Sequence, residues 1–242
     1  EGTADGVVSS MGTPDPSGGV RGGLMNPSRA AWFFAVGLAW LVLRGILVHA
    51  IPAFGAAEIA EKGGLWLVVP LLSFVASLTV PVFFAAFLRH HRFERGGALR
   101  PATILALTAS LLSCGLVGLA LIATVRPSDL GAGWMAVVPL WMTTLIPLVF
   151  VVSIFLFLVA FSRAGEFARE LRFAARVGAV GTSVPIVLIT AWMANSTIGI
   201  PSWYPAFSQG LAARVLGLAA AATLFWFLES FATRYVGESD AP

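Results

Sequence analysis

Long apolar runs separated by short polar segments dominate the pattern of this chain. The run from Trp134 to Phe161 contains no charged residue. As a helix it would be about 40 Å long, at a rise of about 1.5 Å per residue. The hydrocarbon core of a bilayer is about 30 Å thick, so a tilted or bent helix of this length crosses it. The run therefore predicts a membrane-spanning helix.

Five further runs have the length and composition of membrane spans. The predicted spans are residues 30–51, 65–88, 102–125, 134–161, 177–194 and 207–228. We expect an all-α fold, a polytopic membrane helix bundle with six transmembrane helices, in which residues 29–236 form one transmembrane domain. Residues 1–28, rich in Gly, Ser, Pro and Asp, are expected to be a flexible cytoplasmic tail, and residues 237–242 a second cytoplasmic tail.

Composition and the placement of basic residues support this reading and give an orientation. The chain is 58% hydrophobic and only 11% charged, whereas soluble domains carry about 25% charged residues. Arginines gather in the tails and in the segments Arg89–Arg100 and Arg163–Arg176, whereas the opposite side of the spans has only Lys62 and Arg126. Basic loops stay in the cytoplasm, so both termini are predicted to be cytoplasmic. We expect a multi-pass protein of a cell membrane, with a bacterial inner membrane as the expected location.

Two arginines fall inside predicted spans. Arg44 and Arg214 should each lie about 10 Å below the outer surface, where a charge costs about 2–3 kcal/mol. No acidic residue within a predicted span can neutralise either one. In one interpretation both side chains extend outward to lipid headgroups. In the other they share an anionic ligand, such as a lipid phosphate or a carboxylate, with Gln209 and His49 as neighbouring groups.

The Arg163–Arg176 segment has apolar residues on one helical face and arginines on another. This pattern predicts an amphipathic helix lying on the inner leaflet, separate from the next span. Such a helix would hold anionic lipid or dock a cytoplasmic partner, together with the Arg89–Arg100 segment. The candidate docking residues are Arg89, Arg92, Arg95, Arg169, Arg172 and Arg176.

Few residues suggest cofactor chemistry. The single cysteine excludes an internal disulfide and any multi-cysteine metal site. His49 lies at the outer end of the first predicted span, and His90 and His91 lie at the inner end of the second. Because a membrane thickness separates His49 from the other two, the histidine placement does not support haem or a pigment. We predict no metal site and no catalytic residue, expect bound lipid, and leave other cofactors unknown. The net charge of +3 lies at the membrane edge and does not suggest nucleic acid.

Two function classes fit these observations. The favoured one is a non-catalytic integral membrane subunit, a scaffold or accessory chain of a larger membrane complex that contacts partner helices, lipid or pigment. The predicted spans carry no ion-coupling carboxylate and no catalytic constellation, so enzyme activity stays open but is not favoured. The alternative is a permease subunit that moves an anionic or amphipathic small molecule or lipid, driven by a separate cytoplasmic ATPase. Arg44 and Arg214 support it. The expected partners are membrane lipids and other membrane-protein subunits.

Overall fold

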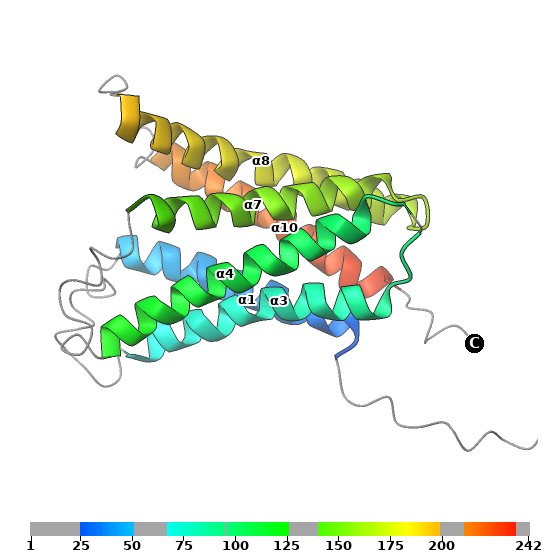
Figure 1. Ribbon diagram of the computed structural model, residues 1–242, viewed down its shortest axis with the longest axis horizontal. Coiled ribbons are helices and arrows are strands. Elements are labelled where there is room, and N and C mark those ends of the chain that lie inside the picture. Colours follow the sequence, from blue (N-terminus) through cyan, green and yellow to red (C-terminus); the bar gives the residue numbers. More distant parts are fainter. Residues whose placement is uncertain (1–24, 51–66, 95, 126–139, 199–210, 236–242) are drawn as a thin grey trace, which may run out of the picture.

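The computed structural model describes residues 25–50, 67–94, 96–125, 140–198 and 211–235. Within these ranges the chain forms six α-helices and no β-strand. The helices are α1 (Pro27–Ala50), α3 (Val68–His90), α4 (Leu99–Val125), α7 (Leu140–Arg163), α8 (Arg169–Ile198) and α10 (Leu211–Arg234). Figure 1 shows them running alternately in opposite directions along the length of the bundle. The all-α prediction is confirmed for the described residues.

Each helix packs against the next one in chain order, and α10 packs against α1, so the helices close into a ring. The hydroxyl of Ser28, in the first turn of α1, donates a hydrogen bond of 3.1 Å to the backbone carbonyl of Tyr235, directly after α10. The two ends of the described chain therefore meet at one end of the bundle. We call it the basic end, because Arg89, Arg163 and Arg234 lie in the last turns of helices that finish there.

Five of the helices are long and apolar enough to cross a membrane. The qualifying segments are Val68–His90, Leu99–Ile122, Leu145–Arg163, Arg169–Ala191 and Val215–Arg234. Helices satisfy their backbone hydrogen bonds internally, which is what a segment in hydrocarbon requires. The chain is therefore a multi-pass membrane protein.

The helices do not begin and end where the apolar runs do. At the basic end α3 continues past the predicted boundary at residue 88 to His90, and α10 continues past residue 228 to Arg234. A helix propagates through its backbone hydrogen bonds, so charged side chains at the membrane edge extend it without difficulty. The apolar runs mark the hydrocarbon-spanning part, and the helices extend into the interfacial layer.

One expectation is wrong. The arginines of the Arg163–Arg176 segment were expected on a separate helix lying on the membrane surface. Instead, α8 runs continuously from Arg169 to Ile198, so Arg169, Arg172 and Arg176 occupy its first two turns. The apolar face of this part packs inside the bundle, where Leu171 is 2% exposed and Ala174 1%. The segment is amphipathic because its apolar side packs against the other helices, not because it lies on the membrane surface.

The core lies close to the basic end and is built mainly from phenylalanine. The helices α3, α7 and α10 each carry two phenylalanines four residues apart, a spacing that places both rings on one face. With Phe84, these side chains are each less than 2% exposed: Phe83, Phe87, Phe157, Phe161, Phe227 and Phe231. Their aromatic rings contact one another between helices. For example, the ring centroids of Phe83 and Phe231 are 5.3 Å apart, and those of Phe84 and Phe157 are 5.1 Å apart. Edge-to-face pairs of this kind add about 0.5–1.5 kcal/mol each beyond burial, so they help to hold α3, α7 and α10 together.

Candidate functional site

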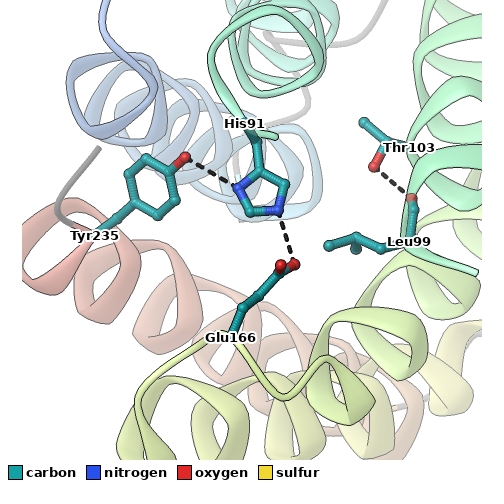
Figure 2. A network of polar contacts seen from close by, with 5 residues as sticks. All are labelled: His91, Leu99, Thr103, Glu166 and Tyr235. Carbon is teal, nitrogen blue, oxygen red and sulfur yellow. Dashed lines mark hydrogen bonds and ion pairs between the residues drawn. The ribbon is translucent and has the colours of Figure 1, made fainter. Parts of the chain in front are cut away.

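Three polar side chains from distant parts of the chain meet at the basic end (Figure 2). His91 directly follows α3, Glu166 lies in the connection between α7 and α8, and Tyr235 directly follows α10. His91 Nε2 lies 2.8 Å from Glu166 Oε1, and the Tyr235 hydroxyl lies 3.4 Å from His91 Nδ1. They meet because α3, α7 and α10 all end here, each on the same Phe-rich core.

The hydrogen-bond inventory assigns the donors in this network. An ionised Glu166 can only accept, so His91 Nε2 carries a proton and donates a hydrogen bond to the carboxylate. In the neutral imidazole Nδ1 is then an acceptor, and the Tyr235 hydroxyl donates to it at the long end of the hydrogen-bond range. Both ring nitrogens of His91 therefore have partners within the protein.

Three aromatic side chains pack against the His91 ring. Phe87 stacks on it at 4.8 Å with an interplanar angle of 9°, and Phe167 stacks at 5.1 Å and 27°. Phe93 meets it edge-on at 4.9 Å and 90°. The His91 side chain is only 11% exposed. The imidazole therefore extends the aromatic core to the surface and ties both connections of the basic end to it.

A cavity of about 370 Å³ lies against this network, with Arg92 and Arg234 also on its wall. A histidine paired with a carboxylate can serve proton transfer when its other nitrogen reaches a reacting group. Here that nitrogen is engaged by Tyr235, and Phe87 and Phe167 stack on the imidazole. Among the described residues, no group of three or more His, Cys, Asp or Glu side chains lies together as a metal site requires. The geometry of His91, Glu166 and Tyr235 fits a structural clamp better than a reaction centre. We call these three residues the His91 clamp.

The predicted docking arginines lie at the basic end but on different surfaces. Arg89 lies in the last turn of α3, and Arg92 borders the cavity beside His91. The arginines of α8 line a second groove, between α8 and α10, together with Arg234. Arg95 lies outside the described residues. Arg234 lines both hollows, so the two neighbour each other, and the docking role of these arginines stays a prediction.

The predicted anion site is described only in part. Arg44 lies in α1, and its Nε is buried without a hydrogen-bond partner among the described residues. Arg214 lies near the start of α10, which packs against α1. Counted from the bonded pair Ser28 and Tyr235, the two positions lie about 24 Å and about 32 Å from the basic end. Gln209 and the side chains of His49 and Arg214 lie outside the described part of the chain.

Sequence reasoning missed the clamp and the α10 side of the second groove. Glu166 is 75 residues from His91 and Tyr235 is 144 residues from it, so no local spacing links them. One signal was available: the repeated Phe spacing of four residues near the basic end of three helices predicts a shared aromatic core there. Residues that follow those helices directly would then meet above it.

No family model, curated protein or solved structure matches the chain.

Proposed function

We propose that this protein is a non-catalytic subunit of a larger membrane complex, a scaffold or accessory chain that docks a partner on its basic end. The observation that carries the proposal is the His91 clamp. It holds the connection after α3, the connection after α7 and the end of α10 in one arrangement. The polar groups of the clamp form hydrogen bonds with one another, which suits a structural rather than a catalytic role.

A preformed surface favours association, because ordering of loops and side chains on binding opposes affinity. Around the clamp the exposed arginines Arg89, Arg92, Arg100 and Arg163 surround the short connections; we call these four residues the basic platform. Clustered positive charge speeds encounter with an acidic surface and helps to fix the orientation of the partner. An acidic cytoplasmic face of a partner subunit is the occupant that this chemistry favours.

Six spans and cytoplasmic termini are part of the proposal. The helix α1 is 24 residues long and packs in the ring between α3 and α10, which supports it as a sixth span. The positive-inside rule places the basic end, with both termini, in the cytoplasm. A bacterial inner membrane stays our proposed location, on the basis of the sequence alone.

A cross-linking experiment tests the docking surface. A photoreactive amino acid at Arg92 or Arg163, in the full chain in native membranes, is expected to capture one partner chain that also co-purifies in a constant molar ratio. The double variant Arg92→Glu and Arg163→Glu should lose that chain. The double variant Arg92→Lys and Arg163→Lys should keep it, since the partner recognises the positive charge rather than the shape of the side chain. If nothing is captured at either position, or if charge reversal leaves the partner bound, the docking proposal is wrong.

The second candidate is a permease subunit for an anionic or amphipathic molecule, and Arg44 favours it. A buried guanidinium N–H without a partner costs about 1–3 kcal/mol, which an anion bound between α1 and α10 would offset. The replacement Arg44→Leu should then abolish transport or binding of the anion, and Arg44→Lys should retain part of it. If the Leu variant behaves like the wild type, Arg44 serves only the fold. Co-purification of a cytoplasmic ATPase would favour this candidate over the scaffold.

A further inference from the structure

The groove between α8 and α10 at the basic end has a volume of about 610 Å³. Arg169, Arg172 and Arg176 lie along one face of α8, at spacings of three and four residues, and Arg234 closes the groove from α10. The carboxylate that faces them belongs to Glu170, whose Oε2 lies 3.9 Å from an Arg234 guanidinium nitrogen. Both side chains of this pair are more than half exposed, so it neutralises little of the charge.

Arg172 supplies an independent observation. Its Nε is buried and has no hydrogen-bond partner among the described residues. A buried donor left unpaired is unfavourable, and guanidinium groups match phosphate oxygens in geometry and charge. The groove therefore presents guanidinium groups of the kind that bind a phosphate, and one of them, that of Arg172, has an unpaired buried Nε.

The position of the groove relative to the bilayer identifies the class of ligand. It lies where two of the helices that are apolar enough to cross a membrane reach their charged ends. Between Arg172 and Arg176 along α8, Phe173 forms an edge-to-face pair with Trp226 of α10 at 6.0 Å and 81°. These rings are 56% and 41% exposed, and aromatic rings in this zone contact the glycerol and upper acyl region of lipids. The groove is thus lined by both guanidinium groups and exposed aromatic rings.

From this arrangement we propose that the α8–α10 groove is a binding site for an anionic glycerophospholipid. The lipid phosphate lies among the guanidinium groups of Arg172, Arg176 and Arg234. The acyl chains pass along Phe173 and Trp226 into the bilayer. The site does not depend on the scaffold function proposed above, because it needs only the membrane and these two helices.

Native mass spectrometry of the full chain, released from nanodiscs with equal amounts of phosphatidylglycerol and phosphatidylcholine, tests this site. The wild type should retain one phosphatidylglycerol in preference to phosphatidylcholine. Arg172→Gln should lower that preference about fivefold, in line with the usual effect of one basic residue near an anionic membrane. Arg172→Lys should lower it less. Arg100→Gln, an exposed arginine of α4 at the same end, is the matched control and should leave it unchanged.

Two further arms separate the possible outcomes. Arg176 is exposed, so Arg176→Gln reports on the ligand even if Arg172→Gln reduces folding, and it too should lower retention severalfold. Millimolar inorganic phosphate should not displace the retained lipid, because it lacks the acyl chains. An unchanged preference in both glutamine variants, or complete displacement by phosphate alone, overturns the assignment to a lipid.

Discussion

At the scale of single residues, His91 acts as a packing element as much as a polar one. An imidazole that is 11% exposed has nitrogens that water satisfies poorly, and an unpaired polar group in such a place is costly. Glu166 and Tyr235 supply the partners, and Phe87 and Phe167 supply the ring contacts. Either set of contacts without the other would leave part of the ring poorly accommodated.

This division leads to a mutational prediction. In His91→Phe the ring contacts remain and the two hydrogen bonds are lost, so we expect a loss of about 1 kcal/mol in stability. In His91→Ala the stacked rings lose their partner as well, and the loss should be larger by about 1–3 kcal/mol. Thermal unfolding of the purified protein in mild detergent measures both values.

The neighbouring His90 provides the control for these variants. Its Nδ1 bonds the backbone carbonyl of Ala86 at 2.8 Å, within its own helix, so His90→Phe should change stability by less than about 0.5 kcal/mol. Equal losses in His90→Phe and His91→Phe would show that the link between the two connections carries no stability of its own.

At the scale of elements, close helix contacts depend on two glycines that face threonines. A Cβ at Gly181 in α8 would collide with the Thr223 hydroxyl of α10, and a Cβ at Gly37 in α1 would collide with Thr79 of α3. Small residues at such contacts let helix backbones approach each other, which is how helices in membranes gain packing energy. By contrast, a Cβ at Gly217, also in α10, would have nothing within 4 Å.

Replacing these glycines by alanine should give opposite results. Gly181→Ala forces α8 and α10 apart and should destabilise the protein by about 1–3 kcal/mol, the usual cost of overpacking. Gly217→Ala meets open space and improves helix propensity, so it should be neutral or stabilising by up to about 1 kcal/mol. Thermal unfolding in the same detergent compares the two, and a Gly181→Ala protein as stable as Gly217→Ala would argue against the close contact.

The elements also show which parts of the fold can be read from the sequence. Apolar runs predict helices because the bilayer demands internal backbone hydrogen bonding, and every predicted span overlaps a helix. Amphipathicity was the misleading signal: the apolar face of Arg169–Arg176 fits a surface helix and a buried helix end equally well. Only its neighbours decide between the two, and Leu171 is buried against other helices rather than against lipid.

At the scale of the whole molecule, the packing order of the helices creates both candidate sites. The clamp needs α3, α7 and α10 to end together, and the lipid groove needs α8 beside α10. Spacing along the chain specifies neither arrangement, because the connections allow many packing orders. Arg234 shows the difficulty: in the sequence it is one basic residue among several, whereas in the bundle it borders both sites.

The ring also makes the orientation of the protein testable, since the start of α1 and the end of α10 are bonded at the basic end. Single cysteines at Arg92 and Arg169 should share one side of the membrane, and the positive-inside rule places that side in the cytoplasm. The native Cys114 is buried and donates to the Ser77 carbonyl at 3.1 Å, so Cys114→Ser gives a suitable background. A membrane-impermeant maleimide should label both positions only after cells are permeabilised. It should label a cysteine at Lys62 already in intact cells. Labelling of Arg92→Cys from outside would show that the proposed orientation is wrong. Labelling of the two positions from opposite sides would contradict the ring arrangement of the helices.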